Sequence, residues 1–310
     1  MKTVITSLLL ASLCCGAVHA ADTSAPAANR FAASIAPTER FESGILAVER
    51  HGSSGSPVIL IPGLSSGSWA WQDLVRRLKD KHAVYVVTLP GFDGRPAASG
   101  AVFEQARAGL RQLIVARKLD HPVLVGHSLG GTLALALAEA DSSLLRGVVS
   151  IDGLPVMPGS EQTPPAMRAQ MAAAMKARFA AAPASQFAAQ QQKYMRGIGV
   201  TDMAMADELA KLSARSDPAA VTSIMGEVVE QDLRAGLPRI TVPVLVIAPF
   251  FEPDAIQRGL TEPMVKEYYT ALMTGTPKLE VTTVAPSRHF VMFDQPEVLA
   301  GVLQAFIEKN

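Results

Sequence analysis

Short apolar runs recur along the chain, separated by segments in which apolar residues repeat at helical spacing. Short runs bounded by turn residues are typical of buried strands, whereas a repeat every three or four residues indicates a helix that buries one face. Strands that alternate with helices favour a parallel sheet with helices on both faces. The predicted strands of this part are 57–61, 83–88, 122–125 and 147–151, and the predicted helices are 69–79, 103–117 and 132–140.

The segment before the first buried run has a different pattern. Residues 44–50 alternate between apolar and polar positions, and a turn-forming stretch at 52–56 separates them from the apolar run at 57–61. Alternation is typical of a strand with one face in solvent. We therefore predict a hairpin that leads into the first buried strand.

The alternation of strands and helices stops after Leu154. Up to about Leu237 the chain is rich in helix-forming Ala, Met and Gln, which predict helices such as 166–181, 184–194 and 203–214, and it has no convincing apolar strand. Parallel sheets bind ligands at the carboxyl ends of their strands, so a helical block inserted there, at about 154–237, predicts a cap over a pocket. The alternative is a second helical domain packed elsewhere. Beyond the block, strands are predicted at 242–247 and 278–284, and helices near 263–273 and 296–308.

The first residues have the features of an export signal. Lys2 precedes a mainly apolar stretch at about 5–18, and small residues lead up to Ala20. This arrangement predicts a signal peptide at 1–20 that is cleaved near Ala20, and the stretch is too short for a stable membrane anchor. Residues 21–40 are rich in Ala, Ser, Thr and Pro and predict a flexible lead-in to a domain at 41–310. The protein is expected in the periplasm or outside the cell.

The cysteine content and the charge of the chain limit the metal sites and binding partners that the sequence predicts. Both cysteines, Cys14 and Cys15, lie in the predicted signal peptide, so the mature chain would have no disulfide and no cysteine metal site. The sequence has 28 basic and 28 acidic residues and no basic run. Nucleic acids and anionic membranes attract basic patches, so neither is predicted as a partner. The sequence does not indicate an oligomeric state.

One short motif suggests the chemistry. Residues 126–130 fit the pattern Gly-x-Ser-x-Gly, between an apolar run and a helix-forming run. A sharp turn from strand to helix exposes its serine at the carboxyl edge of the sheet, and the glycines remove side chains that would clash there. This context predicts that Ser128 is a nucleophile. The alternative is a glycine-rich turn whose serine only caps the helix.

A serine hydroxyl needs an adjacent base to remove its proton. His289 follows a predicted strand late in the chain, at the carboxyl edge, and is the predicted base. The other histidines leave with the signal peptide, lie in the hairpin, precede strands at the opposite edge, or point away from Ser128; they are His19, His51, His82, His121 and His127.

With this serine motif and a late histidine, the chain from Gly44 to Asn310 resembles the α/β-hydrolase superfamily. The matching segments follow one another in the expected order and are 61–64, 89–94, 126–130 and 287–290. The resemblance implies an α/β-hydrolase fold with a mostly parallel sheet and a helical cap. It also implies that the backbone N–H groups of Leu64 and Leu129 form an oxyanion hole, with pocket wall as a compatible second role for both.

The acid of the implied triad has three candidates. Most members of the superfamily carry it after the strand equivalent to 244–247, where Glu252 has the usual offset and Asp254 the usual residue type. A minority place it one strand earlier, where Asp152 follows the strand 147–151. All three preserve the order serine, acid, histidine. We favour Asp152, whose alternative role is to cap the turn that starts the cap.

Together these features predict an exported serine hydrolase that cleaves an ester or related acyl bond of a small or medium apolar substrate through an acyl-enzyme on Ser128. A lactonase, thioesterase or amidase would use the same triad, because specificity lies in the cap. A non-catalytic binding protein on a hydrolase scaffold is the alternative from another class. No motif for a cofactor or metal is present, so none is predicted.

Overall fold

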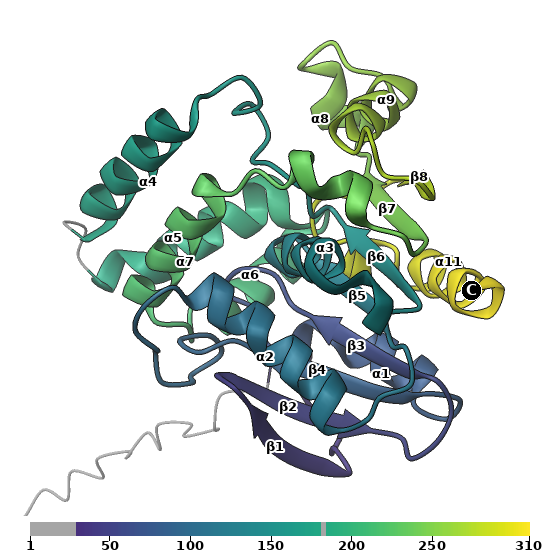
Figure 1. The fold of residues 1–310 in the computed structure, drawn as a ribbon. Helices are drawn as coiled ribbons and strands as arrows, with labels where there is room; N and C mark the ends of the chain where they lie inside the picture. The colour runs from purple at the N-terminus through teal and green to yellow at the C-terminus, as the bar shows by residue number, and fades with distance from the viewer. Residues whose placement is uncertain (1–28, 181–183) are drawn as a thin grey trace, which may run out of the picture.

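The computed structural model describes residues 29–180 and 184–310, so the predicted signal peptide lies outside the described residues. A twisted eight-stranded sheet forms the centre of the molecule (Figure 1), in the spatial order β1-β2-β4-β3-β5-β6-β7-β8. Its strands are β1 (Glu39–Ser43), β2 (Leu46–His51), β3 (Pro57–Ile61), β4 (Ala83–Thr88), β5 (Val123–His127), β6 (Gly147–Ile151), β7 (Val244–Pro249) and β8 (Leu279–Val284).

Strands β3 to β8 are all parallel to one another, whereas β2 is antiparallel to both of its neighbours, β1 and β4. This arrangement is the predicted mostly parallel sheet. The predicted hairpin between 44–50 and 57–61 is wrong, because β2 pairs with β1 and β4 and not with β3. The reason is the burial of β3: all five of its residues are buried, and a strand buried on both faces belongs inside the parallel sheet.

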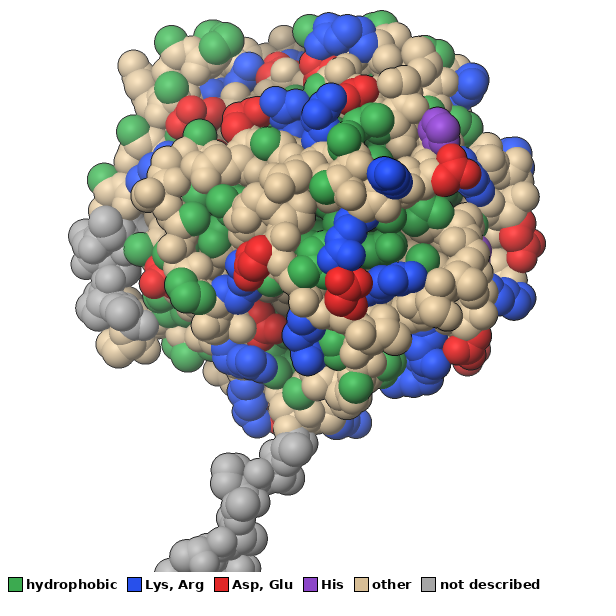
Figure 2. All heavy atoms as spheres, turned by 60° about the horizontal axis from the view of Figure 1, so that its bottom comes forward, with side chains coloured by type: hydrophobic (Ala, Val, Ile, Leu, Met, Phe, Trp, Pro, Cys, Tyr) green, Lys and Arg blue, Asp and Glu red, His purple; other side chains and the backbone are tan. Residues whose placement is uncertain are grey.

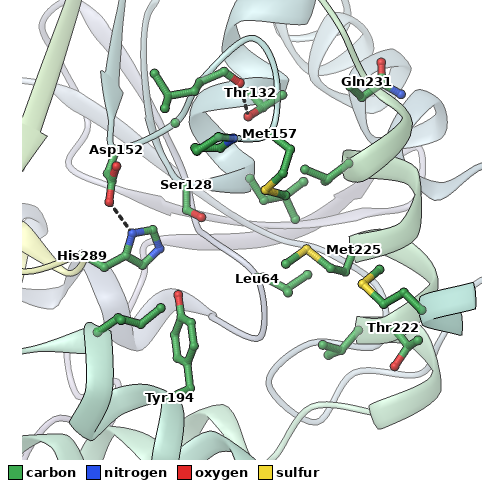
Figure 3. A pocket seen from close by; sticks show the side chains of 18 of the residues that line it. Leu64, Ser128, Thr132, Asp152, Met157, Tyr194, Thr222, Met225, Gln231 and His289 are labelled. Atoms are coloured by element: carbon green, nitrogen blue, oxygen red, sulfur yellow. Dashed lines mark hydrogen bonds and ion pairs between the residues drawn. The ribbon is translucent and has the colours of Figure 1, made fainter. Parts of the chain in front are cut away.

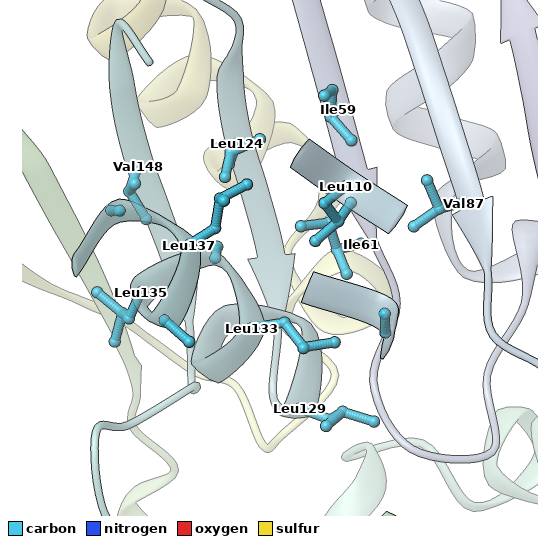
Figure 4. Packing of buried hydrophobic residues seen from close by; sticks show 14 of the residues in the cluster. Ile59, Ile61, Val87, Leu110, Leu124, Leu129, Leu133, Leu135, Leu137 and Val148 are labelled. Atoms are coloured by element: carbon cyan, nitrogen blue, oxygen red, sulfur yellow. The ribbon is translucent and has the colours of Figure 1, made fainter. Parts of the chain in front are cut away.

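Helices cover both faces of the sheet. Alternate residues of a strand point to opposite faces, so Ile59 and Ile61 of β3 join one apolar cluster while Val58 and Leu60 join the other. The first cluster is completed by α2 and α3 (Figure 4), and the second by α1 and α11. Outside the insertion after β6, the helices are α1 (Gln72–Leu78), α2 (Val102–Ala116), α3 (Leu129–Asp141), α8 (Glu252–Ile256), α9 (Glu262–Leu272), α10 (Val291–Asp294) and α11 (Pro296–Lys309).

The chain between β6 and β7 is helical and contains no named strand among its described residues. Its helices are α4 (Pro165–Ala180), α5 (Phe187–Tyr194), α6 (Met203–Ser213) and α7 (Pro218–Glu230), with a π-helical turn at Met195–Gly199. Helix α7 was not among the predicted helices, although its start has a sequence signal. The carboxylate of Asp217 accepts a hydrogen bond from the backbone N–H of Ala220 (2.8 Å), and Pro218 occupies the first turn, as expected at a helix N-terminus.

The described part of the predicted lead-in lies against the domain. The ring of Phe31 contacts the ring of Phe293 edge-on, with centroids 5.6 Å apart. The backbone N–H groups of Ser34 and Ile35 both donate to the Oε1 atom of Gln72 at 2.9 Å. This segment therefore differs from the predicted flexible lead-in, because its apolar side chains pack against the domain beside α10.

Charged side chains of both signs occur on the surface. Figure 2 shows one face, on which Lys and Arg lie between Asp, Glu, hydrophobic and neutral groups. Several arginines form ion pairs, including Arg117 with Glu39 (2.6 Å) and Arg95 with Glu42 (2.9 Å). The absence of a nucleic-acid or membrane partner stays a prediction. Within the described ranges, no helix combines the length and hydropathy needed to span a bilayer.

Candidate active site

The candidate nucleophile Ser128 stands where β5 turns sharply into α3. Its backbone has φ 54° and ψ −121°, a conformation that residues with a side chain rarely adopt. A Cβ atom on Gly126 would lie 2.1 Å from the carbonyl oxygen of Gly130, and one on Gly130 would lie 2.1 Å from that of Ile61. The two glycines therefore permit this close turn. The Ser128 hydroxyl makes no capping bond to α3 and lines a cavity instead (Figure 3).

The candidate base and acid are in direct contact. The Nδ1 atom of His289 lies 2.5 Å from the Oδ2 atom of Asp152, and both side chains line the same cavity as Ser128 (Figure 3). Asp152 directly follows β6, and its backbone N–H donates to the carbonyl of Ile247 on β7 (2.9 Å). The structure thus brings together three residues that are far apart in the sequence.

The other two candidate acids lie elsewhere. Glu252 and Asp254 both lie in the short helix α8 that follows β7. Asp254 binds the guanidinium group of Arg288 through two bonds of 2.8 Å. Glu252 is exposed, and neither residue lines the cavity.

Leu64 and Leu129, the implied oxyanion residues, both line the cavity beside Ser128. Leu129 is the first residue of α3, so its backbone N–H belongs to the unpaired first turn of a helix. Leu64 belongs to the loop after β3, where the next residue, Ser65, has φ 57°. The structure therefore places both leucines beside Ser128, and their role as an oxyanion hole stays a prediction.

His127 has a supporting position that sequence reasoning did not assign. It is fully buried, and its Nε2–H donates to the backbone carbonyl of His289 at 3.0 Å. Burial lowers the pKa of the His127 imidazole well below its usual value, and the nearby His289 acts in the same direction. A neutral His127 thereby anchors the loop that carries the candidate base, while its side chain stays out of the cavity.

The cavity itself has a volume of about 550 Å³ and lies between the strand ends and the helical insertion. From the insertion, the side chains of Met175, Phe187 and Met225 contribute an apolar wall. The hydroxyl of Tyr194 points toward Ser128 and His289 (Figure 3), and its ring meets the His289 ring edge-on with centroids 6.1 Å apart.

A model of the alpha/beta hydrolase family matches residues 58–302. The chain belongs to this family. Family membership confirms the predicted fold class and supports hydrolase activity.

The relatives found by sequence are partial matches. Over 114 residues the chain is 32% identical to the 2-succinyl-6-hydroxy-2,4-cyclohexadiene-1-carboxylate synthase of Escherichia fergusonii. This match covers 36% of this chain and 45% of the synthase. The match thus spans less than half of the relative.

Solved structures cover nearly the whole domain at low identity. A bromoperoxidase from Bacillus anthracis has a TM-score of 0.71 and 18% identity, over 87% of this chain and all (100%) of that one. An esterase from Exiguobacterium antarcticum has a TM-score of 0.70 and 18% identity, over 86% of this chain and 98% of that one. At this identity, the likeness establishes the fold alone.

Within the part of the chain that the structure describes, no cluster of His, Cys, Asp or Glu is arranged to hold a metal ion.

Two tyrosines near the site were not among the residues predicted from the sequence. Tyr194 comes from α5, and Tyr269 comes from α9, where its hydroxyl donates to the Oδ1 atom of Asp152. Neither residue belongs to a motif, so only their place in the folded chain reveals them.

Proposed function

We propose that this protein is an exported serine hydrolase that cleaves an ester or related acyl bond of a small or medium, uncharged, apolar substrate. The observation that carries the proposal is the contact of Asp152 with His289 in the cavity that Ser128 lines. Export is proposed from the sequence of residues 1–20 alone.

The residues have complementary chemical roles. His289 removes the proton of Ser128 as the hydroxyl attacks the substrate carbonyl, and Asp152 stabilises the imidazolium that forms. The backbone N–H groups of Leu64 and Leu129 stabilise the negative oxygen of the tetrahedral intermediate. His289 returns this proton to the departing alcohol, which leaves an acyl group on Ser128, and a water activated by the neutral His289 then releases the acid. An ordered acid and base beside the serine favour turnover over a binding role.

The cavity lining indicates the substrate class. None of its described lining residues is Lys or Arg, and the acidic or basic side chains that line it are Asp152 and His289. A substrate carboxylate would lose its hydration there without gaining a cationic partner, which is costly. The described site therefore favours neutral substrates. It does not favour the product in the name of the Escherichia fergusonii synthase, which carries a carboxylate.

Turnover of neutral aryl esters tests the proposal. Ser128→Ala is expected to abolish hydrolysis of p-nitrophenyl butyrate, because the covalent step is lost, while Ser143→Ala, an exposed serine, keeps the wild-type rate. Retained turnover in folded Ser128→Ala would overturn the proposal. A matched p-nitrophenyl hemisuccinate, which adds a carboxylate, is expected to react with a lower kcat/KM. The same panel extended to lactones, thioesters and amides identifies the preferred acyl bond.

A further inference from the structure

Helix α9 brings a second donor to the candidate acid. The Oδ2 atom of Asp152 faces Nδ1 of His289 at 2.5 Å, and the Oδ1 atom accepts a hydrogen bond from the hydroxyl of Tyr269. The backbone of Asp152 has φ 51° and is fixed by its bond to Ile247. The carboxylate itself still rotates about its side-chain bonds unless both oxygens are held.

Tyr269 is well placed to hold the second oxygen. Its ring packs against an apolar cluster of Leu154, Val156 and Leu272, so the hydroxyl reaches Asp152 from a fixed direction. Burial, and after it the charge of Asp152, raises the pKa of the Tyr269 phenol well above its usual value. The phenol therefore keeps its proton at neutral pH and remains a donor.

The preceding residue offers a contrast within the same helix. The hydroxyl of Tyr268 donates to the Oε1 atom of Glu161, in the loop between β6 and α4, and its ring meets that of Tyr269 edge-on with centroids 6.0 Å apart. Tyr268 is 39% exposed and does not contact the acid. Each tyrosine thus donates to a carboxylate, but only Tyr269 donates to the one beside His289.

We propose that Tyr269 is a positioning residue for the catalytic acid, which holds the Asp152 carboxylate with one oxygen toward His289. This proposal rests on the proposed function of Ser128, His289 and Asp152. The hydrogen bond also spreads the negative charge of the carboxylate, so Asp152 attracts the imidazolium proton less strongly than a carboxylate with a free second oxygen. Loss of the bond would therefore leave the Asp152 carboxylate a stronger acceptor for the Nδ1–H group of His289.

Tyr269→Phe tests this role, with Tyr268→Phe as the matched control. Removal of a hydrogen bond to a charged group is expected to lower kcat by about 10- to 100-fold, because the acid is no longer oriented. KM should change little, since Tyr269 does not line the cavity. The acid limb of the pH–rate profile should move to higher pH. Tyr268→Phe should keep both kcat and the profile.

A double-mutant cycle separates positioning from general stability. If Tyr269 acts through the acid, Tyr269→Phe should cause no further loss in an Asp152→Asn background. A further loss of the same size there, or an unchanged kcat and pH profile in the single variant with a native circular dichroism spectrum, would overturn the positioning role.

The proposed function and the role of Tyr269 can be refuted separately. If Ser128→Ala retains turnover, the triad itself is wrong, and the positioning role falls with it. If Ser128→Ala and Asp152→Asn both lose turnover while Tyr269→Phe behaves as wild type, only the role of Tyr269 is refuted.

Discussion

The segments after β6 and β7 lie side by side, and each carries an aspartate whose carboxylate has a different partner. Asp152 contacts the imidazole of His289 and the hydroxyl of Tyr269. Asp254 binds the guanidinium of Arg288 through both oxygens. Arg288 and His289 are consecutive, so the two acids hold neighbouring residues of one loop. Asp152 contacts the residue with the proposed catalytic role, and Asp254 contacts the residue that holds the loop in position.

Arg288, the partner of Asp254, also links the loop that carries His289 to the helical insertion. Nη1 of Arg288 donates to the backbone carbonyls of Arg196 (2.9 Å) and Val200 (3.2 Å), and the backbone N–H of His289 donates to the carbonyl of Ile198 (3.1 Å). The π-helical turn of the insertion and the histidine loop are therefore joined. Strand position alone thus does not choose among the candidate acids, whereas the contact with His289 favours Asp152.

The largest expected effect separates the two acids by activity. Asp152→Asn should lower kcat by up to about four orders of magnitude, because an amide cannot stabilise the imidazolium and favours the wrong tautomer. Asp254→Asn and Glu252→Gln should stay within about tenfold of wild type, since neither side chain lines the cavity. Steady-state hydrolysis of a neutral aryl ester measures all three. Collapse of Asp254→Asn alone would move the acid to the segment after β7.

A third aspartate, Asp93, extends the comparison to a carboxylate with weaker partners. Its Oδ1 atom lies 3.3 Å from Nε of Arg215. Burial raises its pKa to about 6, against the opposing charge of Arg215. The ionised form is thus disfavoured in the folded state.

The folded-state pKa of Asp93 lies above its ordinary value of 3.8, so the protonated side chain stabilises the folded state. This contribution to the free energy of unfolding is complete below about pH 4 and is lost as the pH rises through about 6. Over this range, wild type should lose on the order of 1 to 3 kcal/mol of unfolding free energy relative to Asp93→Asn. Urea unfolding of both proteins at pH 4.5 and 7 measures the difference. A parallel pH dependence in the two proteins would contradict the raised pKa.

The smallest expected effect concerns the stability contributed by Asp254. Its ion pair with Arg288 is partly buried, with 33% and 14% of the two side chains exposed. Asp254→Asn should therefore cost about 1 kcal/mol and lower Tm by roughly 2 to 4 °C. Differential scanning calorimetry against Glu252→Gln, an exposed neighbour, measures this cost. An unchanged Tm would mean that the pair does not stabilise the histidine loop.

Local patterns predicted the local features of the fold. Apolar runs marked the strands of the parallel sheet, and Gly-x-Ser-x-Gly marked the turn at Ser128. The pairing of β2 with β4 could not be predicted, because the choice of neighbour depends on contacts between distant segments. Helix α7 was not predicted despite its Asp217-Pro218 start, because residues 218–230 include several β-branched side chains, which favour a helix less than Ala, Met and Gln do.

The same distinction applies to the site. Ser128 and His289 were proposed from motifs and their order, and the three candidate acids were also visible. Their partners were not visible, because His289 meets Asp152 and Arg288 meets Asp254 only after the chain has folded. Tyr269 likewise reaches Asp152 from another helix. The sequence therefore limited the candidate acid to three residues, and the contact with His289 favours Asp152 among them.

The most direct test of the proposed triad is labelling of the purified protein by a fluorophosphonate, with the modified peptide identified by mass spectrometry. We expect one adduct, on Ser128, with a labelling rate that falls sharply in Asp152→Asn and His289→Ala and is retained in Asp254→Asn. No adduct on Ser128, or a rate unchanged by Asp152→Asn but lost in Asp254→Asn, would contradict the assignment of Asp152 as the acid that supports an activated serine.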